Sequence, residues 1–204
     1  MSPPRQAVFV DRDGVLNAHV YIGGELDSPL SVGQVKLLPR VGQAIRVLHE
    51  AGFVVIVVSN QPVVAKGKTT HKELARITES ITAQIAEAGG LLDGIYYCLH
   101  HPDAVVEDLR GVCDCRKPAP GLLLQAAHEL NLDLAQSFMV GDRMTDIQAG
   151  AAAGCTTVLV DGPANGIGVR ADVEAHYRTP DLYAAAGWIV GQRDRIGARS
   201  RTAT

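Results

Sequence analysis

The chain has 204 residues, of which 47% are hydrophobic, enough to bury the core of one α/β domain and too few for two. Its net charge of −3 excludes the strongly basic surface that nucleic-acid binding requires. The longest apolar runs, such as residues 53–58, have the length of a strand and fall far short of the ~20 residues of a membrane helix. We therefore expect a cytoplasmic monomer with neither a nucleic-acid nor a membrane partner.

Short apolar runs of strand length alternate with segments of helical periodicity along most of the chain. Strands are predicted over residues 7–10, 53–58, 94–97, 138–140 and 156–160. Helices are predicted after Pro39 up to Gly52, over 72–88, over 122–130 and from the fourth strand to Gly154. Because strands that alternate with helices pair in parallel with right-handed crossovers, we expect an α/β fold with a Rossmann-like, doubly wound, mostly parallel sheet. Ligands of such sheets bind beyond the carboxyl ends of the strands.

The last part of the chain predicts smaller elements. A short helix near residues 182–186 and a strand at 188–190 are expected to close a single domain of residues 1–191. Residues 192–204 are rich in arginine and are expected to form a disordered, solvated tail.

Two carboxylates, those of Asp11 and Asp13, follow the first predicted strand. Neighbouring carboxylates repel each other and need a cation or a shared proton. A magnesium ion takes one or two carboxylates together with phosphate oxygens. A carboxylate can also attack phosphorus while its neighbour moves the proton of the leaving group. The alternative is a turn that uses Asp11, Asp13 and Gly14 for backbone reasons.

Donors suited to a phosphoryl group follow in two further segments. Ser59, Asn60 and Gln61 come directly after the strongest predicted strand and offer uncharged hydroxyl and amide groups. Arg116 and Lys117 stand just before a predicted helix, where the lysine would offset charge on a phosphoryl oxygen and the arginine would offer a planar fork. An ordinary polar loop and a solvated basic pair are the alternatives.

A second pair of carboxylates, Asp142 and Asp146, follows the fourth predicted strand with Arg143 between them. Asp142 is placed to complete a set of carboxylates around a metal ion. The alternative is that Asp142 caps the helix that follows. Carboxylates at two strand ends of one sheet favour the metal.

Cys98, His100, Cys113 and Cys115 form a C-x-H…C-x-C pattern. Clustered cysteines in a reducing compartment favour a metal over disulfides. Zinc binds thiolate and imidazole ligands tetrahedrally, and four protein ligands leave no open position, which is typical of a structural site. Residues 101–112 show no sustained apolar period, so a metal would supply the order that a core cannot. It would also fix the basic pair that follows the last cysteine.

The order Asp-x-Asp, Ser-Asn, Lys and Gly-Asp-x-x-x-Asp resembles that of the haloacid dehalogenase superfamily of phosphatases. Residues 11–17, 92–102, 112–121 and 140–146 resemble one branch of it, the D-glycero-heptose 1,7-bisphosphate phosphatases, which have a minimal cap and a zinc-stabilised loop. The resemblance implies hydrolysis of a phosphorylated sugar, at the C7 phosphate of heptose 1,7-bisphosphate, in nucleotide-activated heptose biosynthesis. It also implies an aspartyl-phosphate intermediate, a catalytic Mg²⁺ and a structural Zn²⁺.

The resemblance assigns roles to residues. It implies that Asp11 is the nucleophile and Asp13 the general acid/base, and that Ser59 and Lys117 stabilise the phosphoryl group. It implies magnesium ligation by Asp11, by Asp13 through its carbonyl group, and by Asp142. It favours His100 over its neighbour His101 as the zinc ligand. Substrate contacts are expected from Asn17, His19, Tyr21, Asn60, Gln61, Arg116 and Arg143.

Two segments depart from the pattern of that family. Pro62-Val63 replaces the Ser-Gly that usually follows Asn-Gln, and His19-Val20-Tyr21 replaces Asp-His-Gly-Tyr. Both segments would contact the sugar or its distal phosphate, so the chemistry is better defined than the substrate. Histidinol-phosphate phosphatase, from the same branch, is the alternative enzyme. A non-catalytic sugar-phosphate binding module is the alternative of another class, which the intact Asp11/Asp13 pair disfavours.

Overall fold

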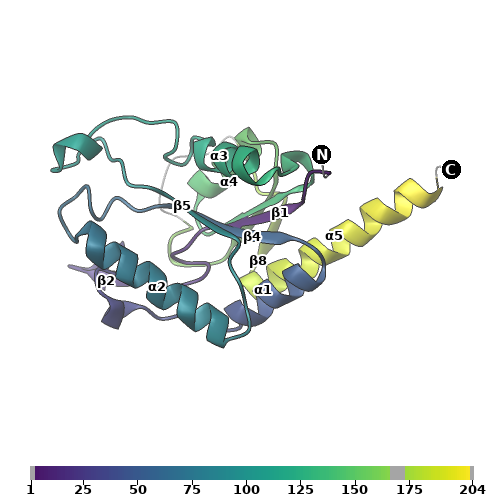
Figure 1. Cartoon of the computed structure of the whole chain (residues 1–204), viewed down its shortest axis with the longest axis horizontal. Coiled ribbons are helices and arrows are strands. Elements are labelled where there is room, and N and C mark those ends of the chain that lie inside the picture. The colour runs from purple at the N-terminus through teal and green to yellow at the C-terminus, as the bar shows by residue number, and fades with distance from the viewer. Residues whose placement is uncertain (1–2, 166–172, 203–204) are drawn as a thin grey trace.

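A six-stranded parallel sheet forms the centre of the computed structural model, which describes residues 3–165 and 173–202, with side chains up to residue 192 (Figure 1). The strand order is β5-β4-β1-β6-β7-β8. The strands β4 and β5 lie on one side of β1, and the later strands β6, β7 and β8 lie on its other side. This is the doubly wound topology that the sequence predicts. The strands are β1 (Ala7–Val10), β4 (Val54–Asn60), β5 (Gly94–Cys98), β6 (Phe138–Gly141), β7 (Thr156–Val160) and β8 (Tyr177–Thr179).

Helices cover both faces of the sheet. The helices α1 (Val41–Glu50), α2 (His71–Glu87) and α5 (Leu182–Thr202) lie on one face, and α3 (Gly121–Leu130) and α4 (Met144–Ala152) lie on the other (Figure 1). Side chains alternate across each strand, so Val8 and Val10 pack toward the first group while Ala7 and Phe9 pack toward the second. Because β1 is covered on both faces, its sequence is apolar throughout rather than alternating.

A small antiparallel hairpin, which the sequence analysis did not predict, stands apart from the main sheet. It consists of β2 (Val20–Ile22) and β3 (Glu25–Asp27), joined by Gly23-Gly24. Both glycines have positive φ, +61° and +87°, as tight two-residue hairpin turns require. Lys68, in the loop after β4, forms an ion pair with Asp27 and ties the hairpin to the body. This small hairpin is in keeping with the minimal cap that the resemblance implies.

The predicted strand at residues 188–190 is wrong, because these residues lie inside α5. Leu182, Ala185, Ala186 and Ile189 are buried at helical spacing against the sheet. The edge strand is instead β8, a segment of three residues that gave no pattern in the sequence. Helix α5 continues to Thr202, past the boundary predicted at residue 191, and the assignment of residues 192–204 to a separate tail stays a prediction.

Three short 3₁₀ helices lie in the connections that the structure describes: Val32–Gln34, Glu107–Leu109 and Leu134–Gln136. Among the residues that the structure describes, no helix has both the length and the apolar character needed to cross a lipid bilayer.

Candidate active site

The carboxyl ends of β1, β4 and β6 bring the predicted motifs to one edge of the sheet. Val10 pairs with Val57 of β4 and with Val140 of β6, so the residues that follow each strand are neighbours. A pocket of about 220 Å³ opens there. The four predicted catalytic residues line it: Asp11, Asp13, Ser59 and Lys117. Of the predicted substrate contacts, four line it as well: His19, Asn60, Arg116 and Arg143.

A buried cluster of carboxylates surrounds Lys117 at this pocket. Asp11, Asp142 and Asp146 offer oxygen atoms that all lie within 4.8 Å of one another. Lys117 Nζ lies 2.9 Å from Asp11 Oδ1 and 2.6 Å from Asp146 Oδ1, and donates to the Val58 carbonyl at 2.8 Å. The cluster thus holds three carboxylates, of which the ammonium of Lys117 contacts two, and negative charge in excess of that one cation is suited to a divalent cation.

The pKa values at this cluster reflect burial first and the neighbouring charges second. Burial, together with the charges of Asp11 and Asp142, raises the pKa of Asp146 to about 7, although Lys117 acts in the opposite direction. Burial also raises the pKa of Asp142. For Lys117, burial favours the neutral amine, but Asp11 and Asp146 more than offset this and the pKa lies above its usual value. The lysine therefore stays charged inside the protein.

The cluster fits a magnesium ion by the chemistry of its donors. All the candidate ligands are carboxylate oxygens, which hard cations prefer. Asp142 Oδ1 is buried and has no hydrogen-bond partner among the described residues. The sequence placed Asp142 between two roles, metal ligand and helix cap. In the structure, Asp146 makes the helix-start contact by accepting from the Arg143 backbone N–H at 2.9 Å, which leaves Asp142 available for a metal.

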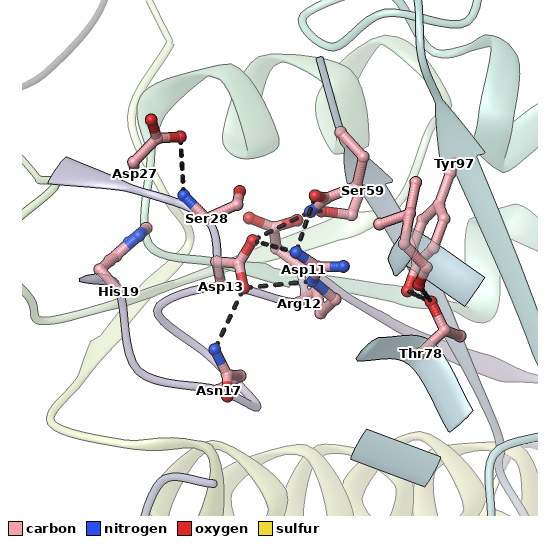
Figure 2. A network of polar contacts seen from close by, with 12 residues as sticks. Asp11, Arg12, Asp13, Asn17, His19, Asp27, Ser28, Ser59, Thr78 and Tyr97 are labelled. Atoms are coloured by element: carbon pink, nitrogen blue, oxygen red, sulfur yellow. Dashed lines mark hydrogen bonds and ion pairs between the residues drawn. The ribbon is translucent and has the colours of Figure 1, made fainter. Parts of the chain in front are cut away.

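The side chain of Asp13 is held apart from this cluster by four donors (Figure 2). Arg12 donates to both carboxylate oxygens, at 3.1 and 2.9 Å. Gln61 donates to Oδ2 at 2.9 Å and Asn17 to Oδ1 at 3.3 Å. Burial alone would raise the pKa of Asp13, but the charge of Arg12 and these hydrogen bonds place it below its ordinary value. This environment therefore favours the ionised form of Asp13.

Asn17 and Gln61 have another role than the substrate contact predicted for them. Both are fully buried, and their polar atoms are occupied within the protein. Asn17 accepts from the Lys36 backbone N–H at 2.8 Å and donates to Asp13. Gln61 accepts from Arg12 at 2.7 Å and donates to Asp13 and, at 3.1 Å, to Ser59. These two amides orient Asp13, which a sequence without burial information does not reveal.

Asn60 also acts inside the protein. Its side chain exchanges two hydrogen bonds with the main chain of Lys117, of 2.9 Å to the carbonyl oxygen and 3.0 Å from the N–H. This pair anchors the loop that carries Lys117 to the end of β4. Asn60 therefore supports Lys117, although part of Asn60 lines the pocket.

Arg12 belongs to the site although the sequence analysis gave it no role. Its guanidinium lies 5.5 Å from the centre of the Tyr97 ring, and the Tyr97 hydroxyl lies 3.2 Å from Thr78 Oγ1 (Figure 2). The only sign of this in the sequence is the position of Arg12 between Asp11 and Asp13. Lys66 was also missed, and lines the pocket from the loop after β4. Tyr21, by contrast, is 66% exposed on β2 and does not line this pocket.

The four predicted zinc ligands come together beside the end of β5. Their ligand atoms all lie within 4.8 Å of one another, with the three sulfurs 3.1 to 3.5 Å apart. His100 Nδ1 faces the sulfurs of Cys115 and Cys98 at 3.5 and 3.9 Å, whereas His101 Nδ1 accepts from the Asp103 backbone N–H. Burial raises the pKa of Cys98 and thereby favours its neutral thiol in the absence of a metal. A bound cation would favour the thiolate instead, so a metal ion suits the cluster.

This doubly wound sheet carries carboxylates after β1 and after β6, with the ammonium of Lys117 between the two sets. The arrangement is that of haloacid dehalogenase-like hydrolases. A family model described as HAD-hydrolase-like matches residues 114–186. The D-glycero-β-D-manno-heptose-1,7-bisphosphate 7-phosphatase of Escherichia coli (strain K12) is 40% identical over 185 residues, which cover 90% of this chain and 87% of that protein. The protein of the same name from Yersinia pestis is 41% identical over 186 residues, covering 90% and 89%. The chain belongs to this family of heptose bisphosphate phosphatases.

A solved structure agrees with this assignment. The D,D-heptose 1,7-bisphosphate phosphatase from B. bronchiseptica, complexed with magnesium and phosphate, matches with a TM-score of 0.75 and 31% identity. The match covers 92% of this chain and 99% of that chain.

Replacing Gln61 by leucine tests its role as the support of Asp13. Leucine nearly preserves the volume but removes the donor to Asp13 and the acceptor for Arg12. We expect kcat to fall, by less than the ~10²–10⁴-fold that loss of a general acid/base costs, with KM for a phosphorylated sugar nearly unchanged. Steady-state kinetics measure both constants. Gln43→Leu, at an exposed position of α1, is the matched control. A rise in KM at constant kcat would instead mean that Gln61 contacts the substrate.

Proposed function

We propose that this chain is a magnesium-dependent phosphatase that removes the C7 phosphate of D-glycero-heptose 1,7-bisphosphate through an aspartyl-phosphate intermediate. The observation that carries the proposal is the buried cluster of Asp11, Asp142 and Asp146 with Lys117 at the pocket. The similarity to phosphatases named for this substrate supports it. The reaction would serve the synthesis of nucleotide-activated heptose in the cytoplasm.

The reaction proceeds in two steps. A carboxylate oxygen of Asp11 attacks phosphorus, and the bond between phosphorus and the C7 oxygen of the sugar breaks. Protonated Asp13 gives its proton to that oxygen. In the second step water attacks phosphorus of the aspartyl phosphate and Asp13 takes a proton from the water. The bond between phosphorus and the Asp11 oxygen breaks, so inorganic phosphate leaves and the Asp11 carboxylate is regenerated. The ionised form of Asp13, which its lowered pKa favours, is the form that acts in this second step.

Lys117 and Ser59 stabilise the phosphoryl group, since one offers a charge and the other a hydroxyl at the same pocket. Asp11 and Asp142 would hold magnesium, together with the carbonyl of Asp13, and Asp146 stands beside them as a further carboxylate. The ion would supply positive charge between the phosphate and the carboxylates. Lys117, whose ammonium lies 2.9 Å from Asp11 Oδ1, lowers the repulsion between that carboxylate and a phosphate.

The walls of the pocket favour a substrate with a second anionic group. Lys66, Arg116 and Arg143 line it together with the catalytic residues. Arg116 is oriented by donating to the His100 carbonyl oxygen at 3.1 Å. A sugar bisphosphate presents a second phosphate to these cations. Histidinol phosphate presents an ammonium group instead, which they would repel. The lining carboxylate of Asp27 is already paired with Lys68.

We also propose that the Cys98, His100, Cys113 and Cys115 cluster holds one structural zinc ion. Four protein ligands leave no position for water, so this zinc would not activate a nucleophile. Its function is geometric, because Arg116 and Lys117 follow the last ligand directly. Zinc would thereby fix the loop that delivers both cations to the pocket.

A comparison of substrates tests the proposed function. Heptose 1,7-bisphosphate should be hydrolysed with a kcat/KM well above that for histidinol phosphate, because three cations of the pocket attract the second phosphate. Steady-state assays with both anomers of the bisphosphate measure this, and a chelator of magnesium should abolish the activity until the ion is restored. Faster hydrolysis of histidinol phosphate, or full activity after exhaustive chelation, would contradict the proposal.

Asp11→Asn tests the covalent step and separates an enzyme from a sugar-phosphate binding module. The amide matches the carboxylate in size but cannot attack phosphorus, so turnover should be lost while the fold is kept. A burst of phosphate release in the wild-type protein should be absent from the variant. Retention of more than a few per cent of the activity, measured beside circular dichroism of both proteins, would exclude Asp11 as the nucleophile.

Cys113→Ser tests the zinc proposal. Elemental analysis should find about one zinc per wild-type chain and far less in the variant, because one of four ligands is weakened. Misplacing Arg116 and Lys117 by ~1 Å can cost about 10²-fold, so kcat should fall and KM should rise. Cys155→Ser is the control, since Cys155 lies outside the cluster. A zinc-free variant with wild-type constants would mean that the cluster serves stability alone.

A further inference from the structure

His19 contacts the carboxylate of Asp142 rather than open space in the pocket. Its Nε2 lies 2.7 Å from Asp142 Oδ2, and the two side chains are 5% and 0% exposed. The other oxygen of this carboxylate, Oδ1, is buried without a hydrogen-bond partner among the described residues. One oxygen of Asp142 is thus fixed by an N–H donor while the second stays free for a cation.

The loop after β1 is shaped around this contact. Gly14 has φ of +87°, and a Cβ atom added there would lie 2.0 Å from Asp142 Oδ2 and 2.7 Å from His19 Nε2. A side chain at position 14 would therefore separate the histidine from the carboxylate. The main chain of Asp142 is held as well, because Asn165 donates to its carbonyl oxygen at 2.8 Å. Asp142 is therefore held both at its side chain, by His19, and at its backbone, by Asn165.

We propose that His19 is a positioning residue of the metal site. By donating from Nε2 to Asp142 Oδ2, it orients Oδ1 for a divalent cation shared with Asp11. Both the neutral tautomer with a proton on Nε2 and the imidazolium can make this bond. Hydrogen bonds to ligating carboxylates fix their geometry, and the loss of such a partner typically costs 10–100-fold in metal affinity. This role rests on the proposed magnesium site and replaces the sugar contact predicted for His19.

Titration of the protein with Mn²⁺ alone, followed by electron paramagnetic resonance, tests this role without substrate. His19→Asn should raise the Kd for Mn²⁺ by about 10–100-fold, because the shorter amide does not reach Asp142. His19→Gln places an amide N–H near the position of Nε2 and should restore most of the affinity. At saturating metal, His19→Asn should recover most of kcat, with KM for the sugar phosphate close to that of the wild type.

The chain contains a matched control in His49, whose Nε2 lies 2.8 Å from Asp93 Oδ2 far from the catalytic cluster. His49→Asn breaks a similar pair and should leave Mn²⁺ affinity unchanged. Asp142→Asn should lose the binding. If Asp142→Asn loses Mn²⁺ while His19→Asn binds it as tightly as the wild type, the positioning role is overturned and the metal site stands. If Asp142→Asn binds as the wild type does, the proposed metal site itself fails.

Discussion

The ammonium group of Lys117 connects three separate parts of the chain at the centre of the site. It reaches Asp11 after β1, the Val58 carbonyl within β4 and Asp146 in α4. Removing one member of a buried ion pair leaves an uncompensated charge, at a cost of about 3–5 kcal/mol. The carboxylates can therefore stay close together only because this cation is buried among them. The rest of the site is arranged so that Lys117 arrives in position.

Two features hold the loop that carries Lys117 in position. The Cys/His cluster closes the loop just before it, and Asn60 holds its backbone with a reciprocal pair of hydrogen bonds. Residue 60 pairs with Cys98 in the neighbouring strand, so the cluster and the amide act from the same edge of the sheet. A change at the cysteines would thus reach Asp11, the proposed nucleophile, through Lys117, which contacts it.

The sequence predicted the parts of this protein that depend on local pattern and missed those that depend on burial. Strands at 7–10 and 156–160 were predicted to the residue, because continuous apolar runs mark strands covered on both faces. A three-residue apolar run at 188–190 was too short to show the helical stripe of α5. The Gly23-Gly24 pair is a sequence signal for a two-residue hairpin turn, although the hairpin was not predicted.

The difference between local pattern and burial also explains which site residues could be predicted from the sequence. Asp11 and Asp142 follow buried strands, and a parallel sheet brings such residues together whatever the details of packing. Whether an amide faces a ligand or another side chain depends on which atoms are buried beside it. Asn17, Asn60 and Gln61 have the residue types of ligand contacts, yet their partners are Asp13 and Lys117. The sequence alone does not distinguish these cases, because both need the same hydrogen-bonding groups.

The two aspartates of the first motif are only two residues apart, and the structure gives each its own cation. Arg12 faces Asp13, with Tyr97 against its guanidinium, while Lys117 faces Asp11. Because Asp11 and Asp13 have different cationic partners, the two carboxylates can have different protonation states within one site. They can therefore have different functions. The pKa of Asp13 lies below its ordinary value, whereas burial and the neighbouring carboxylates raise that of Asp146 to about 7. The proposed base, Asp13, and the proposed cation site can therefore lie side by side in one small pocket although their carboxylates differ in proton affinity.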